Sequence, residues 1–155
     1  MNLFIKKLAK EKKIKVNEPS NSICESCLKK SKKSLVSAKT LLEIGNYDDA
    51  IAMVYYSMYN STLALCYKCG IKSENHTGTI ILLKDLFGIN NKDVMSAKKN
   101  RIDKQYYTDF EANKSEVIEG IKSAEEFNIK IKEFAGKINN EKAKYYNEKI
   151  KELLK

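Results

Sequence analysis

A scarcity of helix-breaking residues is the feature of this sequence that most constrains its fold. The 155 residues contain one proline, Pro19, and six glycines, whereas lysine, glutamate, leucine, isoleucine and alanine are abundant. Proline and glycine oppose the α-helix most strongly, and most of the abundant residues favour it. Long stretches without a helix breaker therefore predict long helices, and we expect an all-α fold.

The helices can be placed from apolar residues that recur at helical spacing and from the glycines between them. Gly45 accepts the left-handed conformation that ends many helices, and Asn46 can begin the next one. Residues 92–110 are polar, so we expect them to be irregular apart from one helical turn near Val94. The expected helices cover residues 22–44, 47–69, 77–87 and 112–134, and a last helix follows Gly136.

The helix expected over residues 47–69 is apolar on nearly all sides. A helix of this kind belongs in the middle of a bundle or at an interface between two copies. Tyr55, Tyr56 and Tyr59 on this helix are therefore expected in the core or in a dimer interface. Short connections favour antiparallel neighbours, so the predicted architecture is an antiparallel up-down bundle of four to five main helices.

The first residues have a pattern of their own. Residues 3–16 read as a short basic amphipathic helix, and Pro19 interrupts the segment that follows. This helix can dock on the bundle, reach a partner or touch an anionic surface, and we favour docking. We therefore divide the chain into residues 1–19, a basic N-terminal helix with a linker, and residues 20–155, the bundle with its C-terminal helix.

The formal net charge of the chain is +9. A balance this basic indicates an anionic partner such as nucleic acid, an acidic protein or a nucleotide. Glutamates interleave with the lysines along most of the chain, so solubility alone is an equally good explanation. No apolar run reaches the length of a membrane span and the first residues show no signal peptide, so we expect a cytoplasmic protein without membrane contact.

Arg101 is the only arginine of the chain and His76 its only histidine. The guanidinium group matches phosphate in shape, and His76 is the only imidazole available for acid–base chemistry near neutral pH. Alternatively, Arg101 pairs with an acidic neighbour at the surface, and His76 caps or packs a helix. The predicted residues for binding phosphate or nucleic acid are Arg101, Lys98, Lys99 and Lys104.

Four cysteines form two C-x-x-C pairs, Cys24 with Cys27 and Cys66 with Cys69. The two pairs lie almost equally far from Gly45, so an antiparallel helix hairpin brings them to the same end. The outcomes are free packed thiols, one or two disulfides, or a four-thiolate metal site. Cytosolic chains usually keep their thiols reduced, so we rank free thiols first, a disulfide second and zinc third, and we expect no metal ion or other cofactor.

Three segments match, in order, the motifs of a family of helical domains. Residues 38–50 follow the pattern A-x-x-L-L-x-x-G-x-Y-x-x-A. Residues 55–60, with the sequence YYSMYN, look like the YYAMFH block found in the second helix of that family. Residues 70–78, with the sequence GIKSENHTG, look like the segment G-I-x-x-x-x-H-S-G that opens its third helix.

A fourth element follows in the expected place. Arg101 and Tyr106 fit the pattern R-x-x-x-D-Y, with Gln105 where aspartate is usual. Over roughly residues 35–110 the chain therefore resembles the HEPN domain of prokaryotic toxin–antitoxin proteins. The resemblance implies a bundle of four or five helices, usually a homodimer, whose members often pair with a small nucleotidyltransferase.

Many HEPN proteins are metal-independent endoribonucleases with an R-x(4–6)-H motif at the dimer cleft. There the histidine helps to polarise the ribose 2′-hydroxyl and the arginine holds the phosphate. This chain departs from the motif, because Tyr106 and Tyr107 stand where the histidine is expected and Asn60 replaces a histidine in the second helix. Cleavage by this chain therefore requires His76 to reach Arg101 within the fold or across the dimer.

We therefore predict an RNA- or nucleotide-linked component of a toxin–antitoxin-type module that works with a small nucleotidyltransferase. If the protein cleaves RNA, the expected catalytic residues are Arg101, His76 and Tyr106, without a metal ion. Tyr106 can instead stack on a base, accept a nucleotide from a partner transferase, or pack against the bundle. One alternative function is a non-catalytic scaffold dimer that holds the transferase or a nucleotide, and another is a small helical metal-binding protein using the two cysteine pairs.

Overall fold

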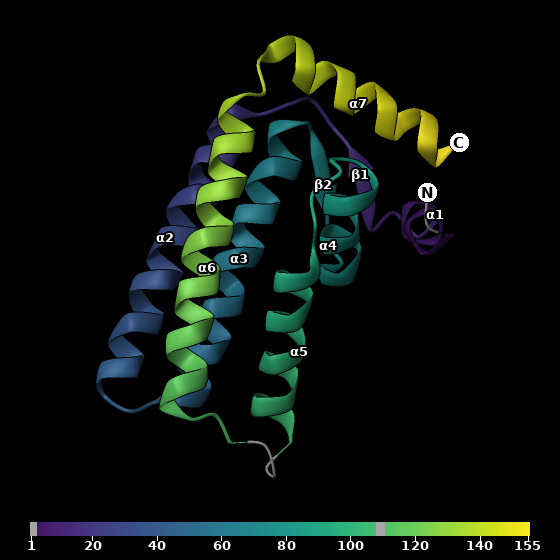
Figure 1. The fold of residues 1–155 in the computed structure, drawn as a ribbon. Helices are drawn as coiled ribbons and strands as arrows, with labels where there is room; N and C mark the ends of the chain where they lie inside the picture. The colour runs from purple at the N-terminus through teal and green to yellow at the C-terminus, as the bar shows by residue number, and fades with distance from the viewer. Residues whose placement is uncertain (1–2, 108–110) are drawn as a thin grey trace.

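The computed structural model describes residues 3–107 and 111–155, and these residues form seven helices and one small sheet (Figure 1). The expected all-α class is therefore confirmed. The elements are α1 (Leu3–Lys10), β1 (Ile14–Val16), α2 (Asn21–Glu43), α3 (Tyr47–Lys68), β2 (Ile71–Ser73), α4 (His76–Asp85), α5 (Lys92–Tyr106), α6 (Lys114–Gly136) and α7 (Asn140–Leu154).

Four helices, α2, α3, α5 and α6, lie side by side and alternate in direction, which agrees with the predicted up-down bundle (Figure 1). Helix α3 packs against the other three. Helix α7 crosses the end of the bundle where α6 finishes, and α1 lies near the end of α7 (Figure 1). Of the helices in the described residues, none is both long and apolar enough to cross a membrane.

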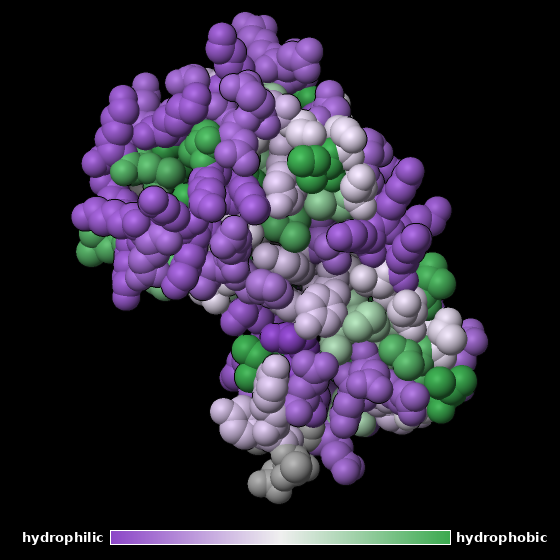
Figure 2. Space-filling view, turned by 180° about the vertical axis from the view of Figure 1, so that it is seen from behind, coloured by the Kyte–Doolittle hydropathy of each residue, from purple (hydrophilic) through white to green (hydrophobic). Residues whose placement is uncertain are grey.

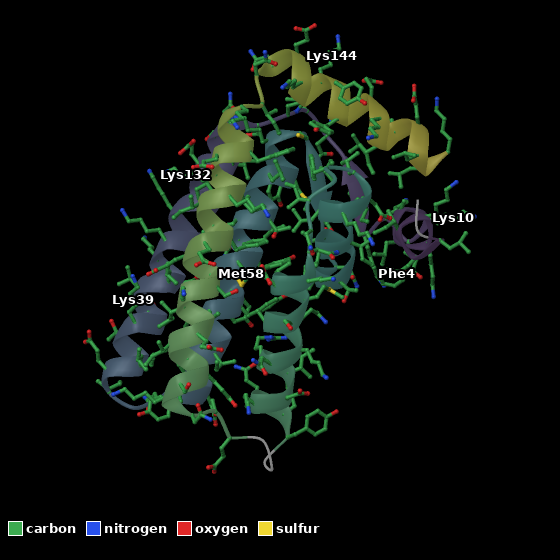
Figure 3. All side chains as sticks on the ribbon, viewed as in Figure 1. Phe4, Lys10, Lys39, Met58, Lys132 and Lys144 are labelled. Carbon is green, nitrogen blue, oxygen red and sulfur yellow. The ribbon has the colours of Figure 1, made fainter. Side chains whose placement is uncertain are left out.

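Helix α3 lies in the middle of the bundle because its own apolar residues face nearly every direction around the helix. Tyr55, Met58 and Leu65 on this helix are fully buried. Met58 lies inside the bundle, whereas Lys39 and Lys132 project from its outside (Figure 3). Figure 2 shows hydrophilic side chains over most of the face seen from behind, with apolar side chains in scattered patches. Burial of apolar surface is the main favourable term in folding, so α3 anchors its neighbours.

The N-terminal segment differs from the helix predicted over residues 3–16. Helix α1 ends at Lys10, and the chain continues into the strand β1. This strand pairs antiparallel with β2, with Ile14 opposite Ser73. The prediction was wrong beyond Lys10 because Ile14 and Val16 are β-branched and alternate with a lysine, which is the period of a strand.

The N-terminal segment nevertheless docks on the bundle as expected. Ile5 and Leu8 on α1, and Ile14 on β1, are buried in the same hydrophobic core as the bundle helices. Helix α1 contacts α4 and α7, and β1 contacts α7 as well as β2. The first elements are therefore part of the packed structure.

Helix α5 occupies most of residues 92–110, so the prediction of an irregular segment was wrong there. Of the residues in α5, Val94 alone is buried, so the helix lacks the apolar stripe from which the other helices were predicted. It forms because it packs along α3 and α6 and because lysine, alanine and glutamine favour a helix. Residues 108–110 lie outside the described residues.

Gly70 allows the end of α3 to meet two other segments. Its φ is +73°, and a Cβ atom at this position would clash with the carbonyl oxygen of Asn17 and with the side chain of Asn147. The Asn17 N–H donates to the Gly70 carbonyl at 2.7 Å. Nδ2 of Asn147 donates to the carbonyls of Asn17 and Cys69, each at 2.8 Å. Glycine at this position therefore permits the junction of α3, α7 and the N-terminal segment.

We predict that Gly70→Ala destabilises the protein more than Gly45→Ala. Both glycines have a positive φ, 73° and 79°, but a Cβ at Gly45 would have no other atom within 4 Å. Gly45→Ala therefore costs only backbone strain, about 1 kcal/mol, whereas the clash at Gly70 adds roughly 2 kcal/mol or more. The free energy of unfolding in urea measures both losses. Equal losses would contradict the close packing at Gly70.

Candidate functional site

Tyr55, in the middle of α3, contacts both the only histidine and the only arginine of the chain. Its hydroxyl oxygen lies 2.7 Å from Nδ1 of His76, and Cζ of Arg101 lies 5.2 Å from the centre of its ring. His76 is the first residue of α4 and Arg101 lies in α5, so tertiary packing brings them together. We call Tyr55, Tyr56, Tyr59, His76 and Arg101 the Tyr55 cluster.

The imidazole of His76 is held on two sides. It stacks on the ring of Tyr59, with centroids 4.0 Å apart and planes 16° from parallel, and the Tyr55 hydroxyl contacts Nδ1. The backbone is fixed as well, because the Asn75 side chain accepts a hydrogen bond from the Gly78 N–H and caps α4. With Nδ1 occupied, Nε2 is the ring nitrogen left for other interactions.

Arg101 is half-buried and is held by aromatic side chains. Its Nη1 donates to the Tyr56 hydroxyl at 2.9 Å and to Oε1 of Gln105 at 3.4 Å. The guanidinium lies over the rings of Tyr55 and Tyr56, with Cζ 5.2 and 5.4 Å from their centres. Within the described residues Arg101 has no acidic partner, and its Nε is buried without a hydrogen bond. A guanidinium in this state is suited to binding an anion.

Burial and nearby cations keep His76 neutral. Burial lowers the pKa of His76 from its usual 6.5, and the positive charges of Arg101 and Lys98 lower this pKa further. Burial also raises the pKa of Tyr55 well above its usual 10, so the phenol stays protonated. At neutral pH the Tyr55 cluster therefore presents a neutral imidazole beside a permanent positive charge.

The lysines predicted to bind phosphate do not all lie at the Tyr55 cluster. Lys98 is half-buried and close enough to lower the pKa of His76, and Lys99 is exposed. Lys104 is directed elsewhere, because its Nζ lies 3.3 Å from Glu116 and donates to the Glu111 carbonyl at 3.0 Å, with its side chain 10% exposed. Arg101 and Lys98 are thus the cations of the predicted set that act on His76.

Tyr106, the third predicted catalytic residue, stands apart from the other two. It follows Arg101 by five positions on α5, which places it about 140° away around the helix. Its side chain is 69% exposed and lines a surface hollow with Asp48 and Asp49. The structure therefore joins His76 and Arg101 through Tyr55, and it leaves Tyr106 as an accessible phenol at another place.

The tyrosines of α3 are core residues, but they also orient the candidate site. Tyr55 and Tyr59 are buried and Tyr56 is half-buried. Sequence reasoning assigned these residues to the core or a dimer interface and did not assign them hydrogen bonds to His76 or Arg101. The available signal was the spacing of Tyr55 and Tyr59, because residues four apart share one face of a helix.

The four cysteines are buried and unpaired in the structure. Cys24 and Cys27 form a small apolar cluster with Ala64, and Cys66 and Cys69 belong to the main core. Burial raises the pKa of all four thiols, to about 12 for Cys69. Within the described residues, which include all four cysteines, no group of three or more potential ligands is arranged to hold a metal ion.

Comparison with known proteins identifies the domain. The family model described as HEPN domain matches residues 24–134, which is more than half of the chain and runs from α2 to α6. The matched region includes His76, Arg101 and the tyrosines of α3. No curated protein matches the chain.

We predict that the four thiols of the folded protein react slowly with a thiol reagent at pH 8. Burial raises their pKa values, so little of each thiol is present as the reactive thiolate. Burial also keeps the reagent away from the sulfur atoms. Colour released from Ellman's reagent should report four thiols only after denaturation. Ser26→Cys is the matched control, because Ser26 is exposed between Cys24 and Cys27 and should add one fast thiol. Fast labelling of the wild-type protein would contradict the packing.

Proposed function

Because this chain belongs to the HEPN domain family, we propose that it acts on RNA as a metal-independent endoribonuclease of a toxin–antitoxin-type module. The observation that carries the proposal is the half-buried Arg101, which lacks an acidic partner in the described residues and lies beside the neutral His76. A guanidinium without a carboxylate favours phosphate. A neutral imidazole can accept a proton near neutral pH.

In the proposed reaction Arg101 binds the phosphate of the scissile bond and stabilises the charge that develops on its oxygens. Nε2 of His76 accepts the proton of the ribose 2′-hydroxyl, and the 2′-oxygen attacks the phosphorus. The bond to the 5′-oxygen then breaks, this oxygen takes a proton from water to leave as a 5′-hydroxyl, and a 2′,3′-cyclic phosphate forms. The tautomer with Nδ1–H donating to the Tyr55 hydroxyl leaves the lone pair of Nε2 available.

We propose further that two copies of the chain pack together along α3. Between Met53 and Tyr67 the partly exposed residues of this helix follow one another at alternating steps of three and four positions, which is the spacing of a helix–helix seam. Tyr56 belongs to this stripe and holds Arg101, so a second copy would place the Tyr55 cluster at the seam. The residues of the stripe are Met53, Tyr56, Asn60, Leu63 and Tyr67.

The partner that we propose for this dimer is a small nucleotidyltransferase. Tyr106 supports this part of the proposal, because its side chain is 69% exposed and its hydroxyl is accessible to a transferase. A nucleotide placed on this phenol would add negative charge about one and a half helical turns from Arg101. The RNA-directed site and the partner site would then lie on the same helix.

A non-catalytic scaffold is the second candidate function. The specific observation in its favour is that His76 stacks on Tyr59 and contacts Tyr55, which are the contacts of a packing residue. In this case His76 holds the start of α4 in place, and Arg101 binds a nucleotide or a phosphate of the partner without turnover. Binding without cleavage distinguishes this function from the first.

We predict that the purified protein degrades RNA in the presence of EDTA and that Arg101→Ala lowers the rate by about 100-fold or more, because one transition-state contact is lost. Arg101→Lys is the matched variant, since it keeps the charge but loses the planar fork. Initial rates on a labelled RNA measure the effect, and circular dichroism checks the fold. Unchanged activity of Arg101→Ala would exclude the mechanism. If the wild-type protein binds RNA without cleaving it, and Arg101→Ala abolishes this binding, the scaffold function is favoured.

We also predict the direction of the pH dependence. His76 must be neutral to accept a proton, and its pKa is lowered from 6.5 by burial and by the charges of Arg101 and Lys98. The rate of single-turnover cleavage should therefore fall on acidification, as the imidazolium forms, with a midpoint below pH 6.5. Lys98→Gln removes one positive charge and should move this fall toward higher pH. A wild-type midpoint above pH 6.5 would contradict the role of His76.

A further inference from the structure

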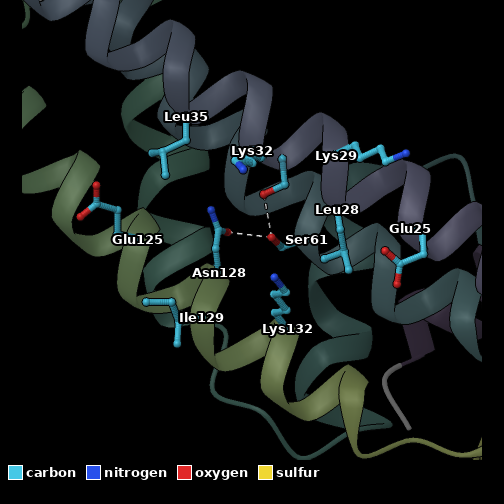
Figure 4. Close-up of a pocket in the computed structure, with 11 residues that line it drawn as sticks. Glu25, Leu28, Lys29, Lys32, Leu35, Ser61, Glu125, Asn128, Ile129 and Lys132 are labelled. Carbon is cyan, nitrogen blue, oxygen red and sulfur yellow. Dashed lines mark hydrogen bonds between the residues drawn. The ribbon is translucent and has the colours of Figure 1, made fainter.

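A pocket between α2 and α6 lies apart from the Tyr55 cluster. Its volume is about 400 Å³, which is within the range of small-molecule sites. Neither His76 nor Arg101 lines it. Figure 4 shows the pocket open along the two helices, with Ser61 of α3 at its base.

The base of the pocket is a closed hydrogen-bond network. Ser61 donates to Oδ1 of Asn128 at 2.8 Å, and Nδ2 of Asn128 donates to the Ser57 hydroxyl at 2.8 Å. The hydroxyls of Ser31 and Ser61 lie 2.8 Å apart, and Ser31 and Ser57 each donate to the other's backbone carbonyl. The network satisfies these buried side chains, so the base of the pocket is preformed.

Three aliphatic side chains form the apolar part of the pocket wall. Leu28 and Leu35 come from α2, and Ile129 comes from α6 (Figure 4). Ile129 is 59% exposed, although burial of a large aliphatic side chain is favourable in free energy. An apolar group that entered the pocket would cover Ile129 and both leucines.

The charges at the pocket favour an anion. Lys132 extends from α6 with its ammonium group toward Ser61 (Figure 4), and Lys32 lines the pocket from α2. Neither lysine has an ion-pair partner among the described residues. Glu125 also lines the pocket, but Nζ of Lys39 lies 2.6 Å from its carboxylate. Glu25 and Lys29 line the pocket as well, and their opposite charges offset each other. The ammonium groups of Lys32 and Lys132 therefore leave a net positive charge beside the apolar side chains.

We propose that this pocket binds a small amphipathic anion, with an aliphatic chain against Leu28, Leu35 and Ile129 and a carboxylate beside Lys32 and Lys132. The lysines are point charges that suit a carboxylate without demanding bidentate geometry. The serines and Asn128 at the base already bond to one another, so we assign the carboxylate to the lysines and not to the base. The site is separate from the proposed cleavage site, so the two proposals can fail independently.

The test compares two soluble probes with the same ten-carbon chain, decanoate and decyltrimethylammonium, each below its micelle concentration. Isothermal titration of the full-length protein should show saturable binding of decanoate and at least about tenfold weaker binding of the cation, because the charge changes sign. Equal binding of the two probes would overturn the proposal, since it would indicate apolar adsorption alone. Absence of decanoate binding would also overturn it.

Variants locate the site. The double substitution Lys32→Glu with Lys132→Glu should weaken decanoate binding at least about tenfold, because two attractive charges become repulsive. The matched control is Lys33→Glu with Lys130→Glu, which makes the same change once on each helix at exposed positions that do not line the pocket. An equal loss in the control would overturn the proposal, because it would show a general effect of net charge.

A second pair of variants tests the apolar wall without changing a lysine. Ile129→Ser should weaken decanoate binding, whereas Ile118→Ser should not, because Ile118 is exposed on the same helix outside the pocket. Both side chains are already about half exposed, at 59% and 49%, so neither change should unfold the protein. Thermal denaturation checks this. Equal binding by the two variants would place decanoate outside the pocket and overturn the proposal.

Discussion

The burial of α3 on nearly all of its sides is the constraint on which the rest of the structure depends. Helices α2, α5 and α6 each pack against it, and Tyr55, Met58 and Leu65 lose all contact with water. Burial of apolar surface stabilises the bundle, but every polar group that is buried with it must find a hydrogen bond. Thr62 of α3 donates to the Met58 carbonyl within the helix. The other buried polar side chains of α3 bond to neighbouring helices in two places, at the Tyr55 cluster and at the hydroxyls of Ser57 and Ser61.

The two places have a common construction. In each, a side chain of α3 is fixed in the core and holds a residue from a more exposed helix: Tyr55 contacts His76 of α4, and Ser61 contacts Asn128 of α6. The outer helices therefore present their functional groups on a support that packing keeps in one conformation. This arrangement explains why a helix with one buried residue, α5, can still position Arg101 over two aromatic rings.

The sequence predicted the elements whose apolar residues recur at helical spacing, and α2, α3, α4, α6 and α7 lie close to the expected ranges. It did not predict α5, because packing on α3 rather than an apolar stripe stabilises that helix. It did not predict β1 either, because a three-residue strand needs a partner distant in the sequence. The approach of His76 and Arg101 to the same tyrosine, Tyr55, could not be predicted, since only tertiary structure decides it. The hydrogen bond between Tyr55 and His76 was not foreseen, because the buried position of Tyr55 already had a packing explanation.

The sheet that joins β1 to β2 also constrains the order in which the molecule can assemble during synthesis. Residues Ile14–Val16 leave the ribosome before α2 and α3 exist, and their hydrogen-bond partners at Ile71–Ser73 emerge only after both helices are complete. Ile5 and Leu8 become buried later still, because α1 packs on α4 and α7, which follow β2 in the sequence. Residues 3–16 are thus seated only after α4 and α7 have been made, and until then the nascent chain carries a basic, apolar segment that is open to chaperones.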